Sequence, residues 1–181
     1  MKKSIIIVTG IFTTIITACS NNNSNEKTDT QTQISTGSNP ATAPVSTPML
    51  PAFTVQDVNG KLINLQGLGG KKVFVNLWAS WCPPCKREMP SIARLYKSVD
   101  TAKVAFVMIS LDDRFEKAKS YIRSSKLELP VYYPAENLPP LFNVQGIPAT
   151  FIFNEKGEMI KRVDGSDNYD SEEYRKLLNE L

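Results

Sequence analysis

The stretch VFVNLWASWCPPCKREMP, residues 73–90, decides the fold. It begins inside a nearly apolar run, Lys71 to Trp78, which predicts a strand buried on both faces. Two cysteines, Cys82 and Cys85, follow with two prolines between them. Apolar residues then recur at helical spacing and predict a helix that begins at the cysteines and bends at Pro90. The stretch therefore predicts a core strand and a helix joined by a turn that carries a cysteine pair.

The rest of the chain alternates predicted strands and helices. Asn59-Gly60 lies between two alternating segments and predicts a tight hairpin. Asp112 or Asp113 is expected to cap a middle helix, and Asp170 a final one. Further strands are predicted over residues 103–110, 130–133, 149–153 and 158–163, with a short helix or turn over 138–142. This order predicts an α/β fold with a parallel core and an antiparallel edge.

Charge and composition exclude several classes of function. The 181 residues carry a net charge of +3, and Lys2 and Lys3 supply two of those charges. Nothing in this balance indicates a nucleic-acid partner. The chain has no histidine, which excludes Cys–His or Ser–His catalytic pairs and all histidine metal sites.

The N-terminus has the pattern of an export signal. Lys2 and Lys3 precede an apolar run, Ile5 to Ala18, that is short and threonine-rich for a membrane span. The run ends in ITAC, residues 16–19, which resembles the bacterial lipobox, where the cysteine is lipidated. The alternative is an ordinary signal peptide that happens to contain a cysteine. We expect residues 1–18 to be a lipoprotein signal peptide and Cys19 to be the lipidated residue.

The next segment has the composition of a flexible tether. Residues 20–48 are mostly Asn, Ser, Thr, Gln and Pro, and such a segment cannot bury enough apolar surface to offset its chain entropy. We expect a flexible linker over residues 19–50 and a folded domain over 51–181. By resemblance to the sorting rules of bacterial lipoproteins, Ser20 rather than Asp after the expected lipidated cysteine indicates the outer membrane, on its periplasmic side, in a cell with two membranes.

The two remaining cysteines form one pair. An even pair in an exported protein is normally a disulfide. A C-x-x-C spacing also suits half of a zinc site, but the chain offers neither histidine nor another free cysteine to complete it. A redox-active pair and an inert structural bridge stay open at this point.

The stretch 73–90 resembles the TlpA/ResA-like branch of thioredoxin-fold proteins. The hairpin FTVQDVNGKLINL, the segment 146–151 and the turn 154–157 match the same branch in the same order. The resemblance covers roughly residues 51–181 and is weak over 112–140. It implies an α/β thioredoxin fold, a central mixed sheet flanked by helices, with an N-terminal β-hairpin and a central insertion.

The same resemblance implies an activity and its partners. It implies a membrane-tethered, extracytoplasmic protein-disulfide reductase that needs no cofactor other than its own redox-active Cys82–Cys85 disulfide. Oxidised envelope proteins are the expected substrates, and a membrane thiol–disulfide protein is the expected electron donor. Members of this branch often serve cytochrome c maturation.

Roles for individual residues follow from the resemblance. Cys82 is expected to be exposed at the helix N-terminus, where free N–H groups and the helix dipole stabilise a nucleophilic thiolate. Cys85, one turn further, resolves the mixed disulfide. Asn76 replaces the buried acid of plain thioredoxin. Glu88 lies on the same helix face as Cys85 and is expected to move its proton, the alternative being a surface ion pair.

Other residues are expected to bind the substrate. Pro148 matches the cis-proline opposite the cysteine pair, so that Ile147 lends backbone hydrogen bonds to a substrate strand. Pro83 and Pro84 stiffen the first helical turn. Trp81 either borders the substrate groove or packs the helix start.

Two other functions remain as alternatives. A peroxiredoxin-like peroxidase would carry a Thr-x-x-Cys pocket, whereas the residue three positions before Cys82 is Ala79. A non-catalytic lipoprotein could use the fold as a binding module. Insulin reduction by the dithiol form distinguishes these classes.

Overall fold

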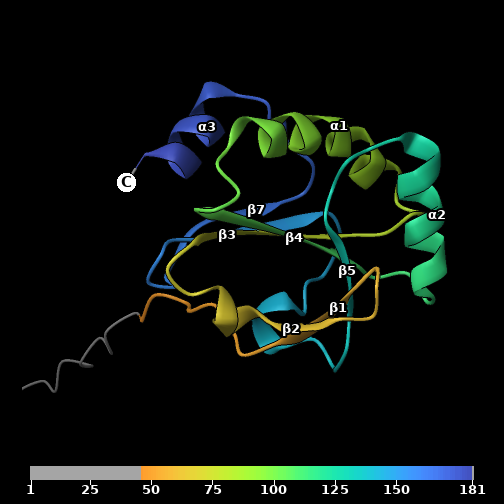
Figure 1. The fold of residues 1–181 in the computed structure, drawn as a ribbon, viewed down its shortest axis with the longest axis horizontal. Coiled ribbons are helices and arrows are strands. Elements are labelled where there is room, and N and C mark those ends of the chain that lie inside the picture. Colours follow the sequence, from red (N-terminus) through yellow and green to blue (C-terminus); the bar gives the residue numbers. More distant parts are fainter. Residues whose placement is uncertain (1–45, 181) are drawn as a thin grey trace, which may run out of the picture. The chain divides into compact units, whose positions relative to one another are not determined.

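The structure is a computed structural model that describes residues 46–180. It contains one seven-stranded sheet in the order β2-β1-β5-β4-β3-β6-β7 (Figure 1). The strands are β1 (Thr54–Asp57), β2 (Leu62–Asn64), β3 (Lys72–Trp78), β4 (Val104–Ser110), β5 (Val131–Pro134), β6 (Ala149–Phe153) and β7 (Met159–Asp164). The helices are α1 (Pro83–Ser98), α2 (Phe115–Ser125) and α3 (Glu172–Asn179), with the 3₁₀ turns η1 (Leu65–Leu68) and η2 (Pro140–Phe142).

The sheet is mixed, as the order of elements predicts. β3, β4 and β5 are parallel, whereas β6 and β7 add antiparallel strands at one edge. The β1–β2 hairpin pairs antiparallel with β5 at the other edge. Gly60 has φ +87 in the hairpin turn, a conformation that glycine adopts at little steric cost. The predicted thioredoxin-like α/β fold with an N-terminal hairpin is confirmed.

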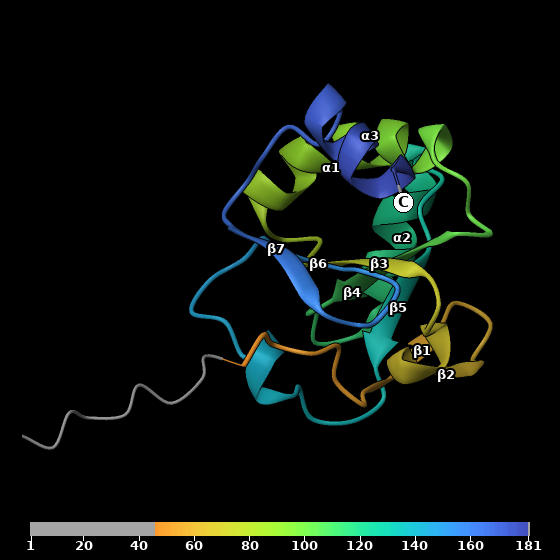
Figure 2. The same cartoon turned by 90° about the vertical axis from the view of Figure 1, so that its left-hand side faces the viewer.

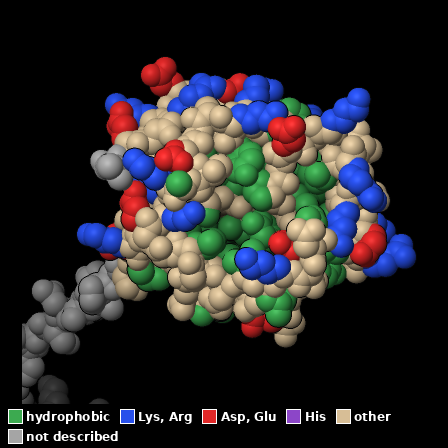
Figure 3. Space-filling model, in the orientation of Figure 1, with side chains coloured by type: hydrophobic (Ala, Val, Ile, Leu, Met, Phe, Trp, Pro, Cys, Tyr) green, Lys and Arg blue, Asp and Glu red, His purple; other side chains and the backbone are tan. Residues whose placement is uncertain are grey.

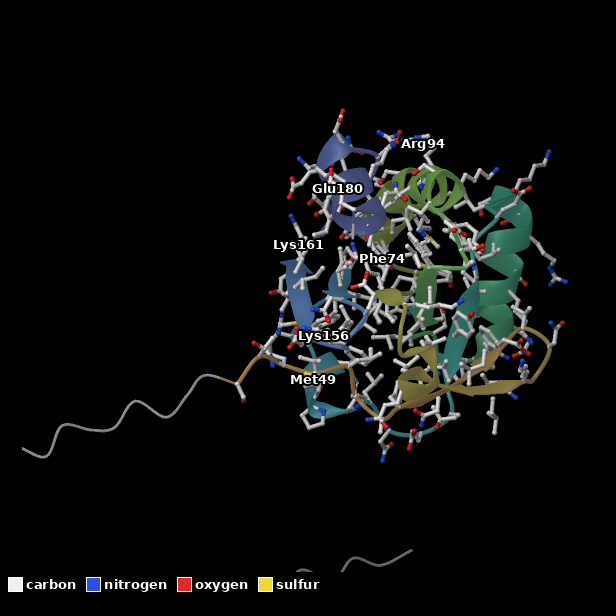
Figure 4. The ribbon with its side chains drawn as sticks, turned by 60° about the vertical axis from the view of Figure 1, so that its left-hand side comes forward. Met49, Phe74, Arg94, Lys156, Lys161 and Glu180 are labelled. Carbon is white, nitrogen blue, oxygen red and sulfur yellow. A yellow bond between two sulfur atoms is a disulfide. The ribbon has the colours of Figure 1, made fainter. Side chains whose placement is uncertain are left out.

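The central strand β3 is buried along its whole length. Phe74 and Trp78 point toward the helices, while Val73, Val75 and Leu77 point to the opposite face, because side chains alternate along a strand. The helices pack on one face of the sheet, and η1 and η2 pack on the other (Figures 1, 2 and 4). Apolar side chains thus pack on both faces of β3, the strand that leads into the cysteine turn.

The first half of β4 has no strand neighbour on its β5 side. β5 pairs with β4 at Met108 and Ile109, near the end of β4. A cavity of about 220 Å³ lies beside the earlier part of β4, lined among others by Val55, Tyr96 and Phe106. Hydrophobic side chains also gather in the middle of the face in Figure 3, between the helices and the hairpin.

The two predicted acidic helix caps are wrong. Arg114, rather than Asp112 or Asp113, occupies the N-cap of α2 and makes no side-chain capping bond. Asp112 instead turns inward and accepts hydrogen bonds from the Ser80 N–H and the Ser110 hydroxyl. Ser171 precedes α3, while Asp170 forms ion pairs with Arg94 and Arg175. In both places the carboxylate has tertiary partners that the local cap pattern does not reveal.

The described chain joins the sheet slightly ahead of residue 51. Met49 forms a bridge with Glu158, and the N–H of Leu50 donates to the carbonyl of Gly157 over 2.7 Å. The expected signal peptide, Cys19 and most of the expected linker lie outside the described residues. Within residues 46–180, none of the helices combines the length and apolar character needed to cross a membrane.

Candidate active site

The cysteine pair lies where β3 ends and α1 begins. Cys82 is the N-cap of α1, and Pro83 and Pro84 occupy the first helical positions, where a missing N–H group leaves no hydrogen bond unmade. Cys82 and Cys85 form a disulfide with their Cα atoms 5.3 Å apart. The Cys85 N–H donates to Cys82 Sγ over 3.2 Å. The helix terminus therefore directs a hydrogen-bond donor at the sulfur of Cys82, which would favour its thiolate after reduction.

Cys82 is far less exposed than the sequence predicts. In this disulfide form only 3% of its surface is accessible, and Cys85 has none. The reason is that Cys82 packs into the core on the helix side of the sheet, while the carbonyl oxygen of Ile147 lies 3.7 Å from its sulfur. The expectation of an exposed Cys82 is wrong for this state. Cys82 is nevertheless the more accessible of the two cysteines.

The loop before β6 lies directly against the cysteine turn. The Ile147–Pro148 peptide bond is cis, as expected. Pro148 is buried and Ile147 half-buried. A pocket of about 380 Å³ adjoins this loop, and its lining includes Gln145, Arg162 and Gly165. The loop thus brings backbone groups and an open pocket to the same side of Cys82.

Glu88 is buried beneath the cysteine turn, so the alternative of a surface ion pair is not what the structure shows. Its Oε1 accepts from Asn76 Nδ2 over 2.8 Å, and its Oε2 accepts from the Asp167 N–H over 3.2 Å. Burial raises the pKa of Glu88 from 4.5 to about 7, although these hydrogen bonds act in the opposite direction. Glu88 can therefore be protonated or ionised near neutral pH.

Asn76 connects Glu88 to two hydroxyl groups that the sequence did not single out. Its Nδ2 also donates to Thr150 Oγ1 over 2.9 Å, and the Tyr169 hydroxyl donates to the same oxygen over 2.7 Å. All four side chains lie in the buried interior. The signal for Thr150 is the antiparallel register of β3 and β6, which pairs it with Asn76.

A second buried carboxylate holds the loop before Cys82. Asp112 accepts from the backbone N–H of Ser80 over 3.0 Å and from the Ser80 hydroxyl over 2.7 Å. It also accepts from the Ser110 hydroxyl over 2.8 Å. Because Ser80 lies two residues before Cys82, Asp112 helps to fix the chain just before the cysteine turn.

The two tryptophans near the site have different surroundings. Trp78 is fully buried, as expected for a core residue. Trp81 is 62% exposed next to Cys82, which leaves the helix-packing interpretation without support. A large apolar side chain is thus open to solvent at the rim of the site.

These features together define a class of protein. A disulfide at a helix N-terminus lies against a cis-proline loop and above a carboxyl group that titrates near neutral pH. Such a site can exchange a disulfide with another protein without a further cofactor. It defines a thiol–disulfide oxidoreductase of the thioredoxin fold.

Comparison with known proteins specifies the family. The chain belongs to the AhpC/TSA family, whose model matches residues 47–162. It is 31% identical over 166 residues to the thiol-disulfide oxidoreductase ResA of Bacillus subtilis, which covers 91% of this chain and 87% of that protein. The protein is a ResA-like thiol–disulfide oxidoreductase.

Solved structures support the same assignment. StoA from Bacillus subtilis is 29% identical with a TM-score of 0.59, over 71% of this chain and 98% of that one. A putative thiol:disulfide interchange protein DsbE from Chlorobium tepidum is 25% identical with a TM-score of 0.64, over 72% and 94%. The relatives are thiol–disulfide oxidoreductases, so the comparisons favour an enzyme over a non-catalytic binding module. At the position where the peroxidase alternative requires threonine, Ala79 is buried and carries no hydroxyl group.

Proposed function

We propose that this protein is an extracytoplasmic, membrane-tethered reductase of protein disulfides. The observation that carries the proposal is the position of Cys82. It is the only cysteine of the pair with accessible surface, its sulfur accepts a hydrogen bond from the Cys85 N–H at the helix start, and it lies against Ile147. In the dithiol form, this is the arrangement of an attacking thiolate beside a place for a client chain.

The reaction proceeds in two exchanges. The Cys82 thiolate attacks one sulfur of a client disulfide, the client S–S bond breaks, and one client thiolate leaves. Cys85 then loses its proton and attacks Cys82 Sγ, which releases the second client thiolate. The client gains two electrons and the enzyme is left with the Cys82–Cys85 disulfide.

Glu88 serves as the acceptor of the Cys85 proton. A general base is most effective when its pKa is close to the working pH, and burial brings the pKa of Glu88 to about 7. Glu88 lies three residues after Cys85 on α1, and residues at this spacing share a helix face.

Client binding uses the rim of the site. An extended client segment lies along the backbone of Ile147 and Pro148, next to the pocket that this loop lines. Trp81 borders that path, and Pro83 and Pro84 keep the first turn of α1 rigid.

Location and partners are inferred from the N-terminal sequence and from the resemblance. A lipid on Cys19 tethers the domain, through the linker that ends near residue 50, to the outer membrane when the cell has two membranes. Oxidised envelope proteins, including apoproteins of cytochrome c, are the clients. A membrane thiol–disulfide protein restores the dithiol.

Insulin reduction tests the activity. The dithiol form of the full chain, with a small-molecule thiol as electron source, is expected to accelerate insulin precipitation. Cys82→Ser is the control and is expected to reduce the rate to that of the thiol alone. Equal rates for the two proteins would contradict the proposed reductase.

A further inference from the structure

A pocket beside the cysteine turn carries cationic side chains. Its volume is about 480 Å³, and it lies at the start of α2. Ser80, two residues before Cys82, is part of its lining, together with Arg114, Lys117 and Tyr121. The pocket is therefore within reach of a client chain bound at Cys82.

Most charged groups at this pocket form ion pairs, whereas Arg114 is near enough to Asp113 to help lower the pKa of that carboxyl group but forms no ion pair. Lys117 forms an ion pair with Asp113 over 2.7 Å, and Glu116 lies 3.7 Å from Lys119. Arg114 is exposed, and among residues 46–180 no carboxylate lies within 4.0 Å of it. Its guanidinium group is thus free to pair with an anion from outside.

Lys86 adds a second cation to the same flank. Its Nζ lies 5.7 Å from the centre of the Tyr121 ring, and it too has no carboxylate partner in the described chain. On the other side of the cysteine turn, by contrast, Arg162 is paired with Asp164 over 2.9 Å. Three cations beside the site therefore form no ion pair in the described chain: Lys86 and Arg114 on the α2 side, and the exposed Arg87, two residues after Cys85.

We infer that this α2 flank selects client segments that carry an acidic side chain next to the disulfide cysteine. The inference rests on the exchange reaction at Cys82 proposed above. An acidic client side chain pairs with Arg114 or Lys86 without breaking an existing ion pair. Trp81 offers an apolar surface for the rest of the segment. Attraction of this kind acts mainly on the association rate, and salt weakens it.

Three peptides test the selection. Each contains one intramolecular disulfide, and they differ only in having Glu, Gln or Lys on both sides of one cysteine. The full chain in its dithiol form is expected to reduce the Glu peptide fastest and the Lys peptide slowest. The expected step is about twofold to threefold per unit of charge at low salt, and it shrinks at high salt. Rates with a small neutral thiol correct for the peptides' own reactivity.

Charge-removing variants identify the flank. In Lys86→Gln/Arg114→Gln, the ratio of Glu-peptide to Lys-peptide rates is expected to fall to near one. The matched control is Lys103→Gln/Lys156→Gln, which removes two exposed cations at the opposite end of the sheet and keeps the wild-type ratio. Figure 4 shows Lys156 at that end.

The outcomes separate the two proposals. If wild-type protein reduces all three peptides at the same corrected rate, or if both double variants lower the ratio equally, selection by this flank is wrong. If the wild-type protein reduces none of the peptides, the exchange activity itself is contradicted and the selection with it.

Discussion

Asn76 donates a hydrogen bond from Nδ2 to Oε1 of Glu88 over 2.8 Å, from the central strand to the helix that bears the cysteines. The second Nδ2 hydrogen is directed at Thr150, and Oδ1 of Asn76 has no partner among residues 46–180. The hydrogen bond that Glu88 accepts from Asn76 favours the ionised form of Glu88. Burial nonetheless makes ionisation unfavourable, so the two effects oppose each other at this carboxyl group.

This balance predicts how stability depends on pH. Because the pKa of Glu88 is about 7 in the folded protein and near its ordinary 4.5 when unfolded, the folded state binds more protons between these values. Stability is therefore expected to fall as pH rises from about 4.5 to about 7, by about 3 kcal/mol from this group. Urea unfolding of the disulfide form measures it.

Glu88→Gln is the control for that measurement. It is expected to remove the Glu88 part of the pH dependence and also to slow resolution of mixed disulfides without unfolding the protein. A variant with the same pH dependence as the wild type would show that another group is responsible. Unchanged exchange rates from pH 5 to 9 would exclude Glu88 as the proton acceptor.

Removal of Asp112 is expected to loosen the loop before Cys82. Asp112→Ala leaves the Ser80 N–H and two hydroxyl groups without their buried acceptor, and is expected to lower the free energy of unfolding by about 2 kcal/mol. Insulin reduction is expected to slow as well. The control is Asp113→Ala, an exposed neighbour whose loss is expected to leave stability near the wild-type value. Equal losses in both variants would contradict the role of Asp112.

Trapping experiments distinguish the two cysteines. Cys85→Ser is expected to accumulate mixed disulfides with client proteins through Cys82, because the resolving thiolate is absent. Cys82→Ser is expected to trap none, since Cys85 has no accessible surface. Non-reducing gels with mass spectrometry measure the adducts. Comparable trapping by both variants would show that Cys82 is not the sole nucleophile.

The reduction potential decides the direction of electron flow. Pro83 and Pro84 place no charge between the cysteines. Lys86 and Arg87 lie just beyond Cys85, where Lys86 is half-buried over the Tyr121 ring and Arg87 is exposed to solvent screening. The Cys82 thiolate is therefore only moderately stabilised. We expect a potential nearer that of thioredoxin, about −270 mV, than that of a strong dithiol oxidant, about −120 mV. Equilibration with glutathione measures it, and a value above about −180 mV would indicate an oxidase or isomerase.

Lipidation at Cys19 can be tested independently of the chemistry. Cys19→Ser is expected to move the protein from the membrane fraction to the soluble fraction while insulin reduction persists. Mass spectrometry of the wild-type protein is expected to find an acyl-modified N-terminal cysteine. A wild-type protein that is soluble and carries no acyl group would exclude the lipid tether.

Local patterns predicted much of the fold and of the site. The apolar run before Cys82 predicts β3, and the Asn59-Gly60 turn predicts the hairpin. Both signals come from residues that are close together in the sequence. The cis bond before Pro148 followed from the family resemblance.

The errors concern side chains whose partners are distant in the sequence. Asp112 looks like a helix cap, but it binds Ser80, 32 residues away. Cys82 looks exposed, but Ile147, 65 residues away, covers its sulfur. Neither contact leaves a local periodicity or motif, so only the folded arrangement reveals it.

The pairing of Met49 with Glu158 has a consequence for how the enzyme meets its surroundings. β6 runs from the cysteine turn to the opposite end of the sheet, where the β6–β7 turn receives the incoming chain. Met49 and Lys156 lie together at that end (Figure 4). The described chain therefore enters the domain at the end of the sheet opposite Cys82, so a force applied through it reaches the β6–β7 turn before it reaches the cysteine turn.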